Sequence, residues 1–316
     1  MSTSAAYIGI DVAKATLEVG SCERVLLRAA NTDEGHRHVV ELLRGLSVAL
    51  VVIESTGVYG QAVVRALVVA GLPVAVVQPG RVRYFARSMS VLAKTDAIDA
   101  MVLARFAEAM KPRRFELPSP QLVRLRAHSD HRDQVVEDRV RAENRLEACT
   151  DPEIAQLLKD TIAVLVKAEE TLARRIAAII ADDPVLKAKS DLLQNETGIG
   201  PQTACILLAQ LPELGTVNRQ EVAALTGLAP YDRSSGNYDG SRHIHGGRAR
   251  VREALYMATI TACRWNQHIA DVYQRLLARG KPKKLAIIAC ARKLIVRLNS
   301  LLAKAHRNAT ATAAGV

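Results

Sequence analysis

Two apolar segments of this chain each end in a single acidic residue, and this pattern constrains the fold more than any other feature. The stretch AYIGIDVA carries Asp11 near its end, and VALVVIE ends at Glu54. Unbroken apolar runs of this length are typical of strands that are buried on both faces, as in a parallel sheet covered by helices. A charge at the end of such a strand is costly unless it is paired or binds a cation. We therefore expect an α/β sheet that brings the two acids to the edge where active sites of such sheets collect.

The first part of the chain predicts the element order β-β-β-α-β-α-β-α. Glycine, proline and polar residues separate the apolar runs, and Thr32 or Asp33 is placed to cap the first helix. Unbroken apolar character predicts buried strands at 47–55 and 72–80, with a helix at 60–71 between them. Pro79 and Gly80 are expected to end the second of these strands.

Composition predicts three parts, at 1–115, 116–189 and 190–316. A proline-rich stretch at 111–121 marks the first boundary. Beyond it, apolar residues recur at helical spacing, which predicts a coiled-coil arm whose two helices are separated by Asp151 and Pro152. The last part reads as mainly α-helical. The apolar positions of the arm are Ile154, Leu158, Ile162, Leu165, Leu172, Ile176 and Ile179.

The stretch VLAKTDAIDAMVLARFAE places Asp96 and Asp99 on one helical face, because positions i and i+3 share a face. Taken alone, the pair is explained by the preference of a first helical turn for acidic residues, and Asp96 could be the N-cap. Together with Asp11 and Glu54, however, the pair gives four carboxylates that a divalent cation would neutralise. Oxygen ligands without Cys or His select Mg²⁺ or Mn²⁺, ions that assist phosphoryl displacement.

The positive charge of the chain is concentrated at its end. The net charge is +11, and from Arg242 onward there are 15 Lys and Arg residues against two acids, Glu253 and Asp271. Such a block is typical of a protein that binds nucleic acid, although basic tails also promote solubility. The aromatic share of 3% argues against base-stacking platforms.

Cysteine usage and hydropathy predict a soluble, cytoplasmic protein with no membrane partner. The five cysteines are scattered, odd in number and without CxxC spacing, which argues against a disulfide framework and a zinc site. No segment approaches the ~18 uninterrupted apolar residues of a membrane helix.

Three blocks, YIGIDVAK, VVIESTGVYG and KTDAIDAMVLARF, resemble the DEDD, RuvC-like domain of IS110-family transposases. TGIGPQTA and LTGLAPYDRSSGNYDGSRHIHGGRARVREALY resemble the C-terminal transposase domain of the same family. The resemblance implies an RNase H-like α/β domain followed by a mainly α C-terminal domain. It also implies that Asp11, Glu54, Asp96 and Asp99 are the catalytic tetrad that holds the metal.

The resemblance further implies a nucleophilic serine in a Ser-Gly motif of the C-terminal domain. That motif is SSG here, and the serine directly before Gly236 is Ser235, with Ser234 as the less favoured neighbour. Without the resemblance, a Ser-Gly pair in a glycine-rich loop is ordinary turn chemistry. TGIGPQTA could form a helix-hairpin-helix turn or a plain turn between helices.

Members of this family recombine DNA, and several use a structured RNA that pairs with donor and target DNA. The resemblance therefore implies both DNA partners, a guide RNA and a homo-oligomer, dimer or tetramer, with a composite active site. His243 and His245 could assist acid-base steps, but solvated loop histidines are the simpler interpretation. The candidate nucleic-acid contacts are Arg233, Arg242, Arg248, Arg250, Lys283 and Lys284.

Three other functions fit parts of the pattern. Actin-like sugar kinases also begin with a strand that ends in an aspartate, but the turn VAKA lacks the glycines that approach nucleotide phosphates. A RuvC-like hydrolytic nuclease or junction resolvase would use the four acids and no serine. A non-catalytic RNA-binding scaffold would need neither.

Overall fold

The computed structural model describes residues 5–55, 57–91, 95–231, 234–235, 238–239 and 242–314; the side chains at 234–235, 238–239 and 309–314 are not described. The chain forms two compact units, Met1–Pro118 and Ser119–Val316. The boundary between them falls in the proline-rich stretch. The finer division into three parts stays a prediction.

A five-stranded mixed sheet forms the centre of the N-terminal unit. Its order is β3-β2-β1-β4-β5; β1 pairs with β2 and β2 with β3 antiparallel, whereas β4 is parallel to both β1 and β5. The carboxyl ends of β1, β4 and β5 therefore lie at one edge, as the apolar runs predict. The strands are β1 (Ala6–Val12), β2 (Thr16–Ser21), β3 (Val25–Ala30), β4 (Val48–Glu54) and β5 (Val74–Val77).

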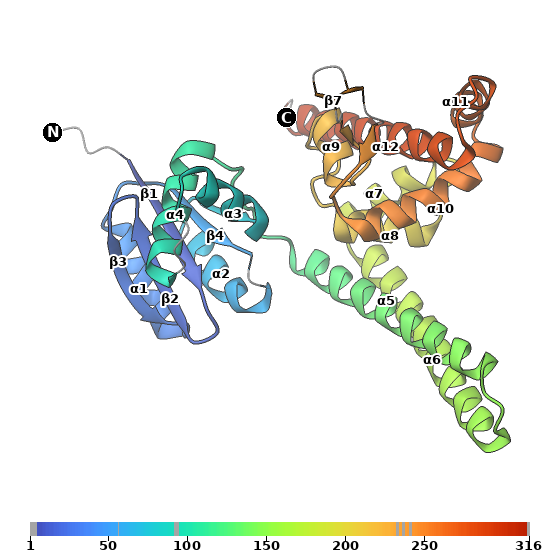
Figure 1. Cartoon of the computed structure of the whole chain (residues 1–316), viewed down its shortest axis with the longest axis horizontal. Helices are drawn as coiled ribbons and strands as arrows, with labels where there is room; N and C mark the ends of the chain where they lie inside the picture. Colours follow the sequence, from blue (N-terminus) through green and yellow to red (C-terminus); the bar gives the residue numbers. More distant parts are fainter. Residues whose placement is uncertain are drawn as a thin grey trace. The chain divides into compact units, whose positions relative to one another are not determined.

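Helices cover both faces of this sheet (Figure 1). On one face, α1 (Asp33–Arg44) and α2 (Gln61–Val69), which follows the short 3-10 helix η1 (Gly57–Gly60), pack on Ile8, Ile10 and Val12 of β1. On the other, α3 (Pro79–Ser88) and α4 (Asp96–Met110) pack on the opposite faces of β4 and β5. Because side chains alternate along a strand, Gly9 and Asp11 face α4.

Glycine allows α4 to pack unusually close to β1 and β2. Gly9 pairs with Gly20 across the two strands. A Cβ atom at Gly9 would lie 2.1 Å from the carbonyl oxygen of Ala100, and one at Gly20 would lie 3.2 Å from the Ala100 Cβ. A larger residue at either position would push the helix away from the sheet. The register of α4 on the sheet therefore depends on these two glycines.

The element order is as predicted except for one additional helix. Pro79 and Gly80 end β5, but Pro79 is also the first residue of α3, where its missing N–H is not needed. Thr32 is the N-cap of α1, and Thr95 rather than Asp96 is the N-cap of α4. The carboxyl group of Asp96 is therefore not used as a cap.

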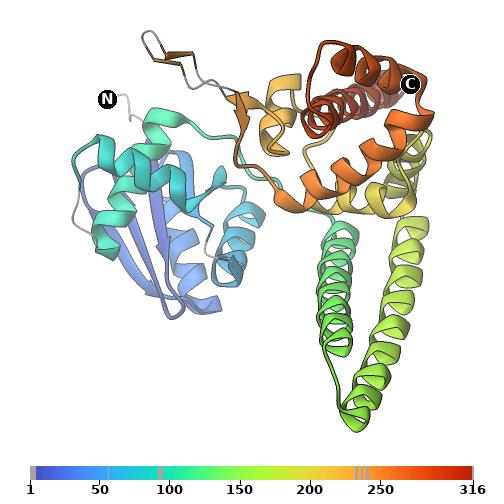
Figure 2. The ribbon, with the colours of Figure 1, turned by 45° about the vertical axis from the view of Figure 1, so that its right-hand side comes forward.

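Two long helices form an antiparallel arm at the start of the C-terminal unit (Figure 2). They are α5 (Pro120–Glu147) and α6 (Pro152–Asp182). Asp151 caps α6 by accepting hydrogen bonds from the N–H groups of Glu153 and Ile154. Leu172 and Ile176 are buried near the base, whereas Ile154 near the tip is 53% exposed. The helical pair is present, and coiled-coil packing along its whole length stays a prediction.

The remainder of the C-terminal unit is a helical core. Glu196 is buried and accepts hydrogen bonds from Asn266 Nδ2 at 2.6 Å and from Arg297 Nε at 2.7 Å. These bonds hold the turn before α8, where Gly198 has φ +105° and lies against α10. The other helices are α7 (Pro184–Gln194), α8 (Pro201–Gln210), α9 (Arg219–Leu225), α10 (Ala249–Trp265), α11 (Gln267–Ala278) and α12 (Lys283–Ala314).

The cysteines are free thiols, and Cys205, Cys263 and Cys290 are buried. None of the helices in the described ranges combines the length and apolar character that a membrane crossing requires.

Replacing Gly9 with Ala should destabilise the N-terminal unit by about 3 kcal/mol or more, because the new methyl group meets backbone atoms of α4 that have no room to move. Gly80→Ala is the matched control, since a Cβ there has nothing within 4 Å and Ala favours the helix. Calorimetric unfolding of both variants measures the difference. Equal stability of the two variants would contradict this packing.

Candidate active site

The sheet brings Asp11 and Glu54 to adjacent positions. Ile10 of β1 pairs with Ile53 of β4 in a parallel register, and each acid is the next residue along its strand. Glu54 is two residues beyond Val52, which packs in the core under α3 and α4, so Glu54 faces the same side as Asp11. The two strand-terminal acids thus share one edge and one face of the sheet.

The first turn of α4 brings the second pair of acids to this edge. Thr95 Oγ1 accepts a hydrogen bond from the Ile98 N–H at 3.3 Å. Asp96 is exposed and Asp99 is half-buried. Asp99 directly precedes Ala100, the residue that contacts Gly9 and Gly20, so the close packing of α4 determines where Asp96 and Asp99 lie.

The pKa of Asp11 is raised in this cluster. Burial, followed by the negative charges of Asp99, Asp96 and Glu54, raises the pKa of its carboxyl group from 3.8 to about 6. All four acids therefore lie close enough to interact. Among the described side chains, no group of three or more His, Cys, Asp or Glu residues stands in an arrangement that could already hold a metal ion.

The donor set nevertheless fits a hard divalent cation. It consists of carboxylate oxygens. Burial and then the repulsion of the other three acids raise the pKa of Asp11, and a bound cation would offset both costs of ionising it. Asp11, Glu54, Asp96 and Asp99 are the residues that would hold the ion.

Three polar contacts of Asn31, near the cluster, were not found by sequence reasoning. Asn31 Nδ2 donates to the carbonyl oxygens of Ala13 and Tyr59 at 2.9 and 3.1 Å, and its Oδ1 lies 2.8 Å from Nε2 of the buried His36. Asn31 therefore ties together the segments that follow Asp11 and Glu54. A short polar residue after β3 is the only sequence signal for this role.

An ion pair lies beside Asp11 on the sheet. Glu18 is opposite Asp11 in the β1–β2 register, and its Oε2 lies 3.5 Å from Arg28 Nε on β3. The charge of Glu18 is therefore matched by Arg28 within the sheet.

Ser235 lies in the C-terminal unit, in one of four two-residue strands that form a small β-ribbon. β7 (Ser234–Ser235) pairs with β8 (Tyr238–Asp239), and β6 (Pro230–Tyr231) pairs with β9 (His243–Ile244). Gly227 and Gly247 meet below the ribbon, where a Cβ on Gly247 would lie 2.1 Å from the Gly227 nitrogen. The close glycine contact anchors both ends of the segment that carries the predicted nucleophile.

Some of the predicted phosphate-binding residues are engaged in internal ion pairs, and others are exposed. Arg248 forms two 2.6 Å hydrogen bonds with Glu213, and Arg250 forms a bidentate ion pair with Asp133. Lys283 and Lys284 are exposed in the first turn of α12. Phosphate contact by any of these residues stays a prediction.

The other candidates of this loop are described in part. Arg242, His243 and His245 are exposed, and Arg233 lies outside the described residues.

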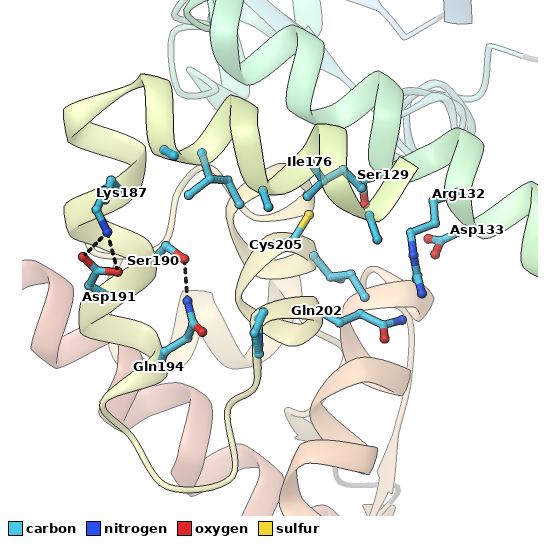
Figure 3. A pocket seen from close by; sticks show the side chains of 16 residues that line it. Ser129, Arg132, Asp133, Ile176, Lys187, Ser190, Asp191, Gln194, Gln202 and Cys205 are labelled. Carbon is cyan, nitrogen blue, oxygen red and sulfur yellow. Dashed lines mark hydrogen bonds and ion pairs between the residues drawn. The ribbon is translucent and has the colours of Figure 1, made fainter. Parts of the chain in front are cut away.

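A cavity of about 490 Å³ lies within the C-terminal unit, where the base of the arm meets α7 and α8 (Figure 3). Ile176 and Cys205 line its apolar part, and burial raises the pKa of the Cys205 thiol to about 11. The Lys187–Asp191 ion pair lies at its margin. None of the predicted site residues with a described side chain lines this cavity.

Comparisons with known proteins agree across both units. Residues 8–152 match a family model for the DEDD transposase of IS110 elements, and residues 190–274 match the model for the transposase IS116/IS110/IS902 family. Pilin gene-inverting proteins of Moraxella lacunata and Moraxella bovis are each 27% identical over 310 residues, 92% of this chain and 94% of theirs. An uncharacterized protein of insertion element IS110 from Streptomyces coelicolor is 26% identical over 148 residues, 46% of this chain and 35% of that protein.

The two family matches, together with the pilin gene-inverting relatives, define a transposase, an enzyme that recombines DNA. The chain belongs to the IS110 family of transposases. A DEDD transposase domain implies an RNase H-like fold and, in general, the use of a divalent metal ion. The mixed sheet of the N-terminal unit agrees with that fold.

Asp11→Asn should stabilise the N-terminal unit at pH 8 in protein stripped of divalent cations. The folded state holds the Asp11 proton more tightly than the unfolded chain, so wild-type stability falls as the pH rises from about 4 to about 6. Without solvent screening, the raised pKa corresponds to a loss of ~3 kcal/mol in the free energy of unfolding when Asp11 ionises. Solvent screening reduces this loss to ~1 kcal/mol, or roughly 4 °C in melting temperature.

Calorimetric melting at pH 4 and pH 8 measures this effect. The gain should disappear at pH 4, where Asp11 is largely protonated in the wild-type protein. Glu41→Gln, which removes an exposed charge from α1, is the control and should show no such gain. A gain in the control equal to that of Asp11→Asn would contradict the assigned environment of Asp11.

Proposed function

We propose that this transposase exchanges DNA strands through a serine-linked intermediate. In this proposal Asp11, Glu54, Asp96 and Asp99 hold Mg²⁺, which Mn²⁺ can replace, and Ser235 is the nucleophile. The observation that carries the proposal is the convergence of the four acids: Asp11 and Glu54 end adjacent parallel strands, and the charges of Asp99, Asp96 and Glu54 add to burial in raising the pKa of Asp11. The Ser-Gly motif of the ribbon supports the choice of Ser235.

The proposed chemistry is a direct displacement at phosphorus. The Ser235 hydroxyl oxygen attacks a DNA phosphorus and loses its proton to water. The bond between phosphorus and the sugar oxygen of the cut strand breaks, and that oxygen takes up a proton from water and leaves as a hydroxyl group. The energy of the broken bond is kept in the serine phosphodiester, so another DNA hydroxyl can reverse the step without ATP. When bound, the metal ion supplies charge stabilisation for the displacement.

Strand exchange is supported over simple hydrolysis by the relatives of this chain. Two proteins that match 92% of its length are named for inverting a pilin gene. Inversion of a DNA segment requires that broken ends be joined to new partners. A hydrolytic nuclease would release the ends instead.

We propose that the complete active site is composite. The four acids belong to the N-terminal unit, and Ser235 belongs to the C-terminal unit. In a homo-oligomer, the serine of one subunit would act with the acids of another. A structured RNA would select the DNA sites by base pairing, and the basic C-terminal quarter would bind the backbones of both nucleic acids.

Ser235→Ala and Asp11→Ala should each abolish strand exchange, while DNA affinity stays within about twofold because neither residue supplies a positive charge. The assay is recombination of a plasmid that carries the element and its flanking DNA. A covalent protein–DNA adduct should form with the wild-type protein and be lost in Ser235→Ala. Ser234→Ala is the matched control and should retain both. Recombination by Ser235→Ala at the wild-type rate would show that this serine is not the nucleophile.

RNA that co-purifies with the protein should contain segments complementary to the DNA on either side of its gene, because base pairing is proposed to select the sites. Sequencing the bound RNA from wild-type cells measures this. RNA without such complementarity would remove guidance from the proposal and leave the serine chemistry intact.

A further inference from the structure

The segment between Glu54 and Asp96, two of the four clustered acids, carries positive charge and no negative charge. It contains five basic residues and neither Asp nor Glu. The whole basic excess of the chain lies in the C-terminal quarter, so this local concentration does not appear in the overall charge. The five residues are Arg65, Arg81, Arg83, Arg87 and Lys94.

Helix α3 presents three of these arginines beside the acidic edge. It begins at Pro79, two residues beyond Val77, which pairs with Glu54. It also packs on the sheet face that carries Asp11 and Glu54, with Val82 and Phe85 turned toward α4. The ring of Phe85 meets that of Phe106 edge to face, at 5.4 Å between centroids. The start of α3 is therefore held close to Glu54.

The outer face of α3 has the composition of a nucleic-acid contact. Arg83, Tyr84 and Arg87 are exposed and fall within about 100° of one another around the helix. Tyr84 is 73% exposed, so the face of its ring is available to a base or sugar. Within the described part of the chain, neither Arg83 nor Arg87 has a carboxylate partner.

Arg81 has a different role from these two residues. Its guanidinium group lies over the ring of Phe106, 5.6 Å from the centroid, and so helps to hold α3 on α4. Arg83 and Arg87 are one helical turn apart, about 6 Å, a spacing at which they can contact neighbouring phosphates of one strand.

We propose that the outer face of α3 binds the DNA strand whose phosphate is positioned at the four acids. Arg83 and Arg87 contact phosphates of that strand, and Tyr84 packs against a base or sugar. This inference rests on the proposed function of the acids and adds a substrate surface in the N-terminal unit. The phosphates bring negative charge toward an acidic site, so flanking arginines offset a repulsion that the site creates.

The double variant Arg83→Ala/Arg87→Ala tests the phosphate contacts in the full-length protein. Its affinity for a labelled single-stranded oligodeoxynucleotide should depend less steeply on salt, with the log–log slope reduced by about 1.4 for two lost contacts. Arg37→Ala/Arg65→Ala is the matched control, because these two exposed arginines lie on α1 and α2 across the sheet. An unchanged slope in the α3 variant, or an equal reduction in the control, would overturn the proposal.

Substitutions at Tyr84 test the stacking contact. Tyr84→Ala should weaken binding of the same oligonucleotide roughly 5- to 100-fold without a change of slope, and Tyr84→Phe should restore it. If an RNA oligonucleotide shows these losses and DNA does not, the assignment of α3 to the DNA strand is wrong.

The proposed function and the α3 surface can fail separately. Asp11→Asn should lose strand exchange and keep the wild-type salt slope. If Asp11→Asn is inactive and the α3 variant keeps the wild-type slope, the α3 surface is wrong while the acids stand. If the α3 variant shows a reduced salt slope and Asp11→Asn still recombines DNA, the role of the acids is wrong while the α3 surface stands.

Discussion

The contact between α4 and the glycines of β1 and β2 is the constraint on which the candidate active site depends. Four carboxylates from two strands and a helix repel one another, so no interaction among them would hold them together. The packing of α4 on β1 and β2 brings them close together instead. Gly9 and Gly20 let the backbone of α4 approach the sheet at Ala100, and the preceding turn then carries Asp96 and Asp99 to Asp11. Apolar burial of α4 offsets the electrostatic cost of the cluster.

The local features of this fold could be read from the sequence because they depend on neighbouring residues. Thr32 and Asp151 cap helices as expected, and the apolar runs form buried strands that end at Asp11 and Glu54. Helix α3 was missed because Pro79-Gly80 is a good strand terminator and Pro79 is equally suited to a first helical turn. Pairings between distant residues, such as Asn31 with Tyr59 or Arg250 with Asp133, leave no local pattern to read.

Charge is arranged differently in the two units. In the N-terminal unit, acids gather at one edge of the sheet, and the chain that links Glu54 to Asp96 is entirely basic or neutral. In the C-terminal unit, arginines that stand out in the sequence are engaged internally: Arg248 with Glu213, and Arg297 with the buried Glu196. Counting charges along the chain therefore overstates the free positive surface of the second unit and understates that of the first.

The arm has a mechanical consequence that follows from its length and from the cavity at its base. Helix α6 has 31 residues, which corresponds to a rod of about 46 Å. Such a rod is stiff along its length, and its base borders the cavity that Ile176 and Cys205 line against α8. A rocking of 5° about that base would swing the tip by roughly 4 Å at constant helix geometry. A small rotation at the cavity would therefore become a larger displacement at the tip of the arm.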